Sequence, residues 1–336
     1  MVDIIIPAYN CSKTLPSTLA SIATQTQLKK CIVTIVDDCS TENLMPIIED
    51  FRKMFGIKIQ YIKLSKNCGS PGLVRQVGID NTRAPFIMFL DSDDLLAPGA
   101  IQILNSAMLD MFPDMVIGQF YCEKKTGELE LYDKSKTTWL HGNIYKRSFL
   151  EKNNIRFCEG YNEDGSFNTQ CLLLSNKLAA IDRPVYYWRY NENSLTREDT
   201  NFTPRYFYHH IRALRYAYHN IYNHPHKKKV YFSLGEHLAQ FVLIYNDVLL
   251  ISKENSDFLA VKKESEKEIE NFVKEEFFIE GADKSAENIL KGLQKGLEKY
   301  DISSLIISVE EFLKKFKIQI DTTGWEFGYR DENSNN

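Results

Sequence analysis

The feature that most constrains the fold is an apolar run that ends in a cluster of acids. Residues 86–90 read Phe-Ile-Met-Phe-Leu, and residues 91–94 read Asp-Ser-Asp-Asp. A short unbroken apolar run is typical of a strand buried on both faces. Because side chains alternate along a strand, we expect Asp91 and Asp93 on one side and Ser92 on the other. Two carboxylates so close either raise each other's pKa or hold a cation such as Mg²⁺. The alternative is a solvated turn with capping aspartates.

Short apolar runs alternate with helical patterns over the first hundred residues. Strands are expected at residues 2–7, 31–36, 57–64 and 86–90, with helices at 12–25, 45–55 and 71–82. This alternation predicts an α/β fold, with a Rossmann-like, mainly parallel sheet flanked by helices. Ligands bind such sheets outside the carboxyl ends of the strands. The polar clusters all follow strand ends, at residues 9–10, 37–38, 67–75 and 91–94, so we expect them to meet in one crevice.

Beyond residue 94 the pattern changes. Helices are expected at residues 98–111, 146–153 and 163–174, strands at 115–121, 177–181 and 184–190, and a hairpin turn at Gly127. Helical patterns then follow at residues 203–222, 228–251, 257–278, 286–299 and 303–316. We expect an α/β domain of residues 1–200, divided into halves of about 1–97 and 98–200. A helical region at 201–330 and a disordered tail at 331–336 complete the chain.

Composition limits the class and the compartment. A net charge of −4 over 336 residues argues against broad binding to nucleic acid. The seven cysteines form no CxxC pair, which favours a reducing cytosol over a zinc site or a disulfide framework. The first residues lack the basic and apolar regions of a signal peptide. The most apolar helical stretch, residues 232–251, contains Glu236, His237, Asn246 and Asp247, so we expect it not to span a membrane.

A dinucleotide-binding fold is disfavoured by the first turn. Residues 7–12 read Pro-Ala-Tyr-Asn-Cys-Ser and contain no glycine, whereas that fold requires G-x-G-x-x-G there; a P-loop is also absent. A bound diphosphate would then have to be met by a cation, for which Asp91 and Asp93 supply a place.

Five short motifs occur in order along the first half of the chain. They are Ile-Ile-Ile-Pro-Ala-Tyr-Asn at 4–10, Val-Asp-Asp-Cys-Ser-Thr at 36–41, Asn-Cys-Gly at 67–69 with Arg75, Leu-Asp-Ser-Asp-Asp at 90–94, and Glu-Asp at 163–164. Together they resemble the family 2 glycosyltransferases, which have the GT-A fold, over about residues 1–200. The resemblance implies inverting sugar transfer from a nucleotide-sugar, usually UDP-linked, with Mn²⁺ or Mg²⁺. Gln76 and Cys39 stand where Asn and Gly are usual, which leaves the exact donor open.

The resemblance places the nucleotide base near the ends of the first two strands. Asp38 would accept the N–H of uracil, whereas cytosine presents an acceptor there; GDP-sugars stay open because guanine also presents donors. Tyr9 would stack on the base, and Pro7 would shape the same wall. The alternatives are a turn cap for Asp37 or Asp38 and a buried structural role for Tyr9.

The acidic motif and the loop before it would bind the rest of the donor. Asp93 would coordinate the metal directly, and Asp91 would contact the ribose or the metal through water, with Ser92 between them. Asp94 is expected to cap a helix. Arg75 would meet the diphosphate or Asp91, unless it forms a surface salt bridge.

The resemblance assigns the chemistry to the second half of the domain. Asp164 would be the base that takes the acceptor proton, and Glu163 would hydrogen-bond acceptor or sugar hydroxyls; the alternative for Asp164 is a helix cap. Trp139 and His141 lie where the family lines the acceptor cleft, although Trp139 also suits core packing.

The segment at residues 187–194 resembles one that closes over the donor. Arg189 would reach the diphosphate there. Asn191 stands where relatives often carry histidine, so no histidine ligand is expected at that position.

The partners follow from the resemblance. We expect a cytoplasmic metal-dependent transferase, or one peripheral at the inner membrane face, acting on a UDP-sugar and a surface-glycan or lipid-linked acceptor. Residues 205–216 mix basic and aromatic side chains, which suits a membrane surface, an anionic acceptor, a subunit in a homo-oligomer, or an ordinary packed helix. The rival functions are a non-catalytic nucleotide-sugar-binding module and a transferase acting on modified DNA bases, which the net charge disfavours.

Overall fold

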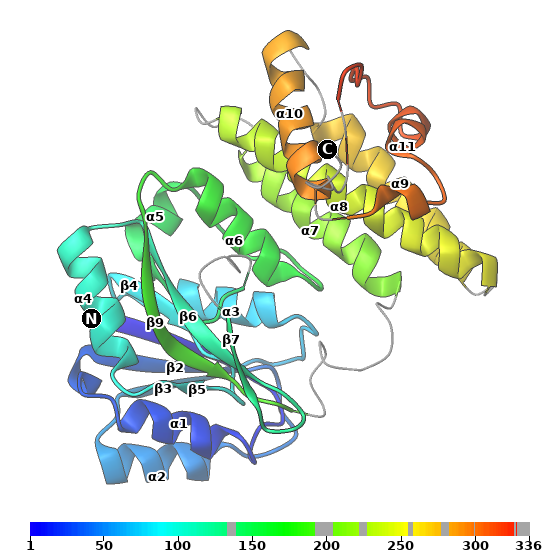
Figure 1. Ribbon diagram of the computed structural model, residues 1–336. Coiled ribbons are helices and arrows are strands. Elements are labelled where there is room, and N and C mark those ends of the chain that lie inside the picture. Colours follow the sequence, from blue (N-terminus) through cyan, green and yellow to red (C-terminus); the bar gives the residue numbers. More distant parts are fainter. Residues whose placement is uncertain are drawn as a thin grey trace. The chain divides into compact units, whose positions relative to one another are not determined.

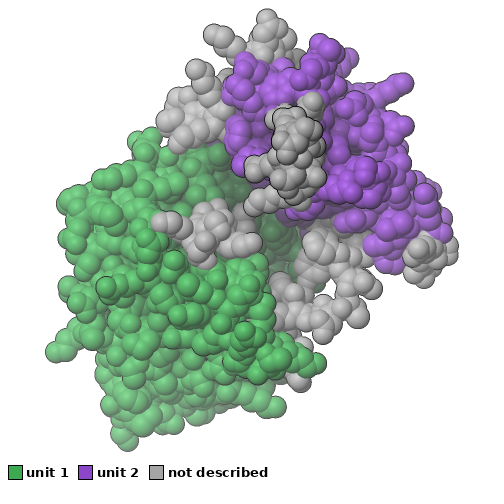
Figure 2. Space-filling model, in the orientation of Figure 1, with its two compact units in different colours: residues 1–199 green, residues 200–336 purple. Residues whose placement is uncertain are grey.

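The computed structural model divides into two compact units, Met1–Asp199 and Thr200–Asn336 (Figure 2). The residues that it describes are 1–132, 139–191, 204–221, 227–254, 258–276, 282–298, 300–325 and 327. The tail expected at residues 331–336 and residues 192–194 of the segment expected at 187–194 lie outside the described residues.

The described residues of the first unit form a nine-stranded sheet in the order β3-β2-β1-β4-β8-β6-β9-β5, with β7 paired to β6. The strands are β1 (Val2–Ala8), β2 (Cys31–Asp37), β3 (Ile59–Lys63), β4 (Phe86–Phe89), β5 (Leu95–Leu96), β6 (Met115–Glu123), β7 (Leu129–Tyr132), β8 (Asn143–Lys146) and β9 (Leu178–Trp188). β1 runs parallel to both β2 and β4, so the chain order reverses at β1. The carboxyl ends of these three strands therefore share one edge, as the α/β prediction requires.

Helices cover both faces of this sheet (Figure 1). They are α1 (Leu15–Ala23), α2 (Met45–Phe55), α3 (Pro71–Asp80), α4 (Ala100–Met111), α5 (Arg147–Lys152) and α6 (Glu163–Leu174). Ile4 and Ile6 of β1 pack in one core cluster with Leu15 of α1, on the face that also holds α2 and α4. Ile5 points to the opposite face, where a Cβ on Gly78 of α3 would lie 2.3 Å from its Cγ2. β1 is therefore buried on both sides, which explains the apolar run at its residues 4–6.

Two expectations for this unit are wrong in detail. The expected strands at 177–181 and 184–190 are one strand, β9, whose register against β6 shifts on either side of Gln119. Such an irregularity lets Pro184 sit within a strand, because the pairing is interrupted there. β4 also ends at Phe89, and Asp94 N–H bonds to the carbonyl of Asp91 at 3.1 Å. The acidic cluster is therefore a turn, and its side chains do not follow strand alternation.

The second unit is helical. Its helices are α7 (Pro204–Ile221), α8 (Lys227–Glu254), α9 (Phe258–Glu276), α10 (Ala282–Leu297) and α11 (Val309–Lys315). α8 and α10 approach closely: a Cβ on Gly235 would lie 2.0 Å from the Ile289 carbonyl oxygen, so only glycine fits there. The expected helix at 303–316 is wrong, because Ser308 and Glu311 form a capping box that starts α11 at Val309.

One stretch of α8, Tyr231–Lys253, is long and apolar enough to cross a membrane by length and composition. More than half of its most apolar window is buried inside the second unit. Its buried residues include His237 and Asn246, and Asn246 accepts the backbone N–H of Ile307 at 2.9 Å. This packing is that of a core helix, in line with the sequence-based expectation.

Candidate active site

Two aspartates at the end of β2 have different hydrogen-bond partners. Asp37 is buried and accepts hydrogen bonds from the Ser40 N–H at 2.8 Å and the Tyr61 hydroxyl at 2.5 Å. Asp37 is therefore the residue that caps this turn. In Asp38, Oδ1 accepts from both the backbone N–H and the thiol of Cys68, at 2.7 and 2.9 Å. The loop before α3 thus fixes the orientation of the Asp38 carboxylate.

The wall expected to meet the base lies beside these aspartates. Tyr9 follows β1 and is 53% exposed, so the buried structural role considered for it is wrong. Pro7, next to the last residue of β1, is partly exposed. Cys39 adopts φ +61°, a left-handed conformation that favours glycine, the usual residue of the resembling motif. The departure at position 39 therefore keeps the backbone shape of the motif while adding a side chain.

Arg75 joins the two halves of the domain. Its side chain is buried; Nη2 lies 2.5 Å from Asp91 Oδ1 and Nη1 lies 2.9 Å from Glu163 Oε1. The alternative of a surface salt bridge is wrong, and Asp91 is one of the expected partners. Burial alone would raise the pKa of Asp91, but Arg75, together with His141, holds it below its usual value.

Asp94 does not cap a helix, because α4 begins only at Ala100. Its carboxylate is 1% exposed and accepts the Tyr186 hydroxyl at 2.6 Å and the Arg189 N–H at 2.8 Å. Burial raises its pKa well above the usual value, and the neighbouring charges of Asp91 and Asp93 raise it further. A buried carboxylate among like charges is what a bound cation would relieve.

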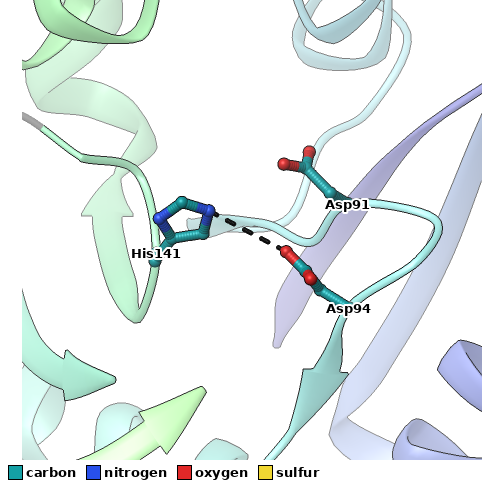
Figure 3. Close-up of side chains that lie close together, drawn as sticks. All are labelled: Asp91, Asp94 and His141. Carbon is teal, nitrogen blue, oxygen red and sulfur yellow. Dashed lines mark ion pairs between the residues drawn. The ribbon is translucent and has the colours of Figure 1, made fainter. Parts of the chain in front are cut away.

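A histidine joins the acidic turn from the other half of the domain. β8 runs antiparallel to β4, so residues just before β8 lie beside those just after β4. His141 therefore meets this turn, and one ligand atom from each of Asp91, Asp94 and His141 lies within 4.8 Å of the others. Figure 3 shows the three side chains facing one another, with His141 Nε2 at 3.8 Å from Asp94 Oδ2.

The sequence predicts Asp91 and Asp93 as the metal pair, whereas the structure groups Asp91 with Asp94 and His141 as residues that could hold an ion. In the structure, Asp93 Oδ2 accepts the side-chain amide of Asn191 at 2.7 Å. One sequence signal for His141 exists, because it is the only histidine among the first 199 residues. No local sequence pattern indicates that β8 pairs with β4, the pairing that brings His141 to the acidic turn.

The expected base stands at the start of α6, as predicted. Glu163 is buried, and burial followed by the charge of Asp164 raises its pKa to about 7 although Arg75 opposes the rise. Burial raises the pKa of Asp164 as well, against the effect of Arg75 and with a contribution from Asp91. Asp164 Oδ1 accepts the Gly165 N–H at 2.7 Å. A carboxylate with a raised pKa is a better proton acceptor at neutral pH.

Three further candidates have structural partners. Arg189 donates through Nε to Glu123 Oε2 at 2.5 Å. The backbone carbonyl of Ser92 accepts the Thr18 hydroxyl at 3.0 Å, which pins the acidic turn to α1. Trp139 packs edge-on against Trp188, with ring centroids 4.6 Å apart, so core packing describes at least part of its role.

Comparisons with known proteins indicate the family of the first unit. Residues 3–163 match the family model Glycosyl transferase family 2. The chain is 25% identical over 227 residues to poly(ribitol-phosphate) beta-N-acetylglucosaminyltransferase TarS of Staphylococcus aureus, covering 63% of this chain and 39% of TarS. It is 26% identical over 226 residues to glycosyltransferase GlyA of Streptococcus pneumoniae, covering 58% of this chain and 31% of GlyA. The chain thus spans well under two thirds of the length of these relatives.

A solved structure shares the fold. The crystal structure of S. aureus TarS 1-349 in complex with UDP-GlcNAc matches with a TM-score of 0.64 and 19% identity, covering 90% of this chain and 94% of that one. The sheet order and the acidic turn at its switch point are those of a glycosyltransferase with the GT-A fold. Residues 3–163 therefore form a domain of the family 2 glycosyltransferases.

Proposed function

We propose that this protein transfers a sugar from a UDP-sugar to a hydroxyl group of a surface glycan or its lipid-linked precursor, with inversion. The observation that carries the proposal is the pairing of Arg75 with both Asp91 and Glu163. This pairing holds the acidic turn and the start of α6 in one centre. The relatives support the substrate class, because TarS is named for transfer to poly(ribitol-phosphate) and has been crystallised with UDP-GlcNAc. UDP-GlcNAc and a polyol phosphate polymer are therefore the first pair to test.

The donor would lie along the carboxyl ends of β1, β2 and β4. Asp38 would read the uracil edge while Tyr9 and Pro7 form the wall beside it. Ser92 and Arg189 complete the donor side in this proposal. The reaction would take place in the cytoplasm or at the inner face of the membrane, where a lipid-linked acceptor is presented.

The site suits a divalent cation. Five carboxyl groups gather there, namely Asp91, Asp93, Asp94, Glu163 and Asp164, and Arg75 pairs with two of them. Oxygen ligands of this kind fit Mn²⁺ or Mg²⁺. Asp91 and Asp93 would hold the ion, which would supply neutralisation of the departing diphosphate.

Asp164 would act as the general base. As the acceptor oxygen bonds to the anomeric carbon, the bond from that carbon to the diphosphate oxygen breaks on the opposite face, and Asp164 takes the hydroxyl proton. Its raised pKa favours that transfer at neutral pH. Arg75 would keep Glu163 in place beside it.

Replacement of Asp164 tests the assignment. Asp164→Asn should lower turnover of UDP-GlcNAc by roughly 10²–10⁴-fold, because Asn is nearly isosteric but cannot take the proton. Affinity for UDP-GlcNAc should stay nearly unchanged, since the interaction is made mainly in the transition state. Asp110→Asn on the exposed end of α4 is the matched control. Weakened donor binding at similar turnover would make Asp164 a helix cap, and Glu163 would be examined next. Donor binding by the wild-type chain without any turnover would favour a non-catalytic binding module.

A further inference from the structure

We propose that Asp91, Asp94 and His141 together bind a divalent cation before any nucleotide arrives, and that His141 makes this site prefer Mn²⁺ over Mg²⁺. The inference deepens the proposed function and rests on it for the use of the ion. It differs from the pairing of Asp91 with Asp93 in two ways: before nucleotide binds, Asp94 takes the place of Asp93, and His141 adds a nitrogen ligand from the other half of the domain.

The spacing of the three groups suits one ion. In an octahedral site with ligands at about 2.1 Å, adjacent ligands lie about 3 Å apart and opposite ligands about 4.2 Å apart. The distance of 3.8 Å from His141 Nε2 to Asp94 Oδ2 falls between these values. The whole set spans no more than 4.8 Å, so small side-chain rotations bring it to coordination distance.

Neighbouring side chains and a backbone N–H fix the positions of His141 and Asp94. The His141 side chain is 10% exposed; its ring stacks on Trp188 with centroids 5.2 Å apart and lies 4.9 Å from the ring of Tyr186. Asp94 receives hydrogen bonds from the Tyr186 hydroxyl and the Arg189 N–H. Hydrogen bonds of this kind orient carboxylates that bind metals. Figure 3 shows the result, with the imidazole nitrogen directed at the carboxylate.

The charge and the ligand types decide which ion fits. The turn from Asp91 to Asp94 carries three carboxyl groups, and Arg75 pairs with Asp91 while also contacting Glu163. Because like charges so close to one another repel, a cation bound among these carboxylates is favoured. Mg²⁺ is bound mainly by oxygen ligands and water. Divalent transition metals accept an imidazole nitrogen more readily, and Mn²⁺ is the weakest binder among them and the one that also suits carboxylates. One imidazole among carboxylates therefore shifts the preference towards Mn²⁺.

The test measures metal binding by the full chain without nucleotide. Binding of Mn²⁺ is followed by the loss of the free-ion signal in electron paramagnetic resonance, and a nitrogen ligand is identified by its modulation of the electron spin echo. The wild-type chain should bind Mn²⁺ and show the nitrogen modulation. His141→Gln should weaken Mn²⁺ binding by at least about tenfold, remove the modulation and change Mg²⁺ affinity much less. His219→Gln, an exposed position on α7, is the matched control.

The wild-type spectrum alone can overturn the proposal. Absence of Mn²⁺ binding without UDP, or bound Mn²⁺ without nitrogen modulation, would remove His141 from the site whether or not the variant folds. Asp93→Ala should keep nucleotide-independent Mn²⁺ binding while losing metal-dependent binding of UDP. If Mn²⁺ binds with the nitrogen signature but no UDP-sugar is turned over, the proposed function fails and the cation site stands.

Discussion

Replacing Glu163 with glutamine should make the first unit more stable at alkaline pH. Glu163 is buried, and its pKa is raised from 4.5 to about 7, chiefly by burial. Between pH 4.5 and about pH 7, the folded chain therefore keeps a proton on Glu163 that the unfolded chain has already released. Stability must then fall as the pH rises through this window. At 1.36 kcal/mol per pH unit, the ionised carboxylate costs about 3 kcal/mol above pH 7.

Glutamine resembles the protonated acid and does not carry this cost. The quantity to compare is the free energy of unfolding of Glu163→Gln minus that of the wild type. We expect this difference to be about 3 kcal/mol larger at about pH 8 than at about pH 4.5. The control is Glu151→Gln, at an exposed position of α5. Its free energy of unfolding should stay within about 0.5 kcal/mol of the wild-type value at both pH values.

The assay is urea unfolding with a chelator present, so that no cation compensates the charge. Trp139 and Trp188 lie in the first unit and report its unfolding; a Trp325→Phe background removes the third tryptophan of the chain. A difference between variant and wild type that does not grow with pH would refute the reasoning. It would mean that attraction to Arg75 outweighs the cost of burial.

Three further predictions concern the donor and the packing of the site. Calorimetry should show metal-dependent binding of UDP and none of CMP, and Asp38→Asn should weaken UDP binding by roughly 1–3 kcal/mol; equal affinities for UDP and CMP would remove Asp38 from base recognition. Asp93→Ala should abolish metal-dependent UDP binding and turnover with an unchanged circular dichroism spectrum, and activity that persists in a chelator would contradict this. Gly72→Ala places a Cβ 2.4 Å from Glu163 Cγ, so it should lower the free energy of unfolding by about 1–3 kcal/mol. An unchanged free energy in urea unfolding would show that α3 and α6 can move apart to accept the methyl group.

The parallel half of the sheet was predictable because burial on both faces leaves a local signal. β4 is an unbroken apolar run and β1 contains one at residues 4–6, and each strand is followed by polar residues that the parallel arrangement brings to one edge. The capping box at Ser308 and Glu311 is also a local sequence signal, and it places the start of the last helix at Val309 and not at residue 303.

The roles of Asp94 and His141 were not predictable from local pattern. Asp94 is held by Tyr186, which lies 92 residues further along the chain. His141 reaches the turn only because β8 inserts antiparallel beside β4. Neither pairing leaves a periodicity in the sequence, since strand order is decided by packing between distant segments. The turn at Asp91 was also hidden, because an apolar run does not mark where a strand ends.

One guanidinium serves both sides of this centre, and that sharing makes the two sides thermodynamically dependent. Arg75 pairs with Asp91, on the proposed donor side, and with Glu163, on the proposed acceptor side, through separate nitrogens. A ligand that brings another positive charge to Asp91 weakens the attraction between Asp91 and Arg75, so Arg75 interacts more strongly with Glu163. Occupancy of one side therefore alters affinity on the other by some factor, and reciprocity requires the same factor in both directions. An acceptor analogue should change the dissociation constant of UDP as much as UDP changes that of the analogue.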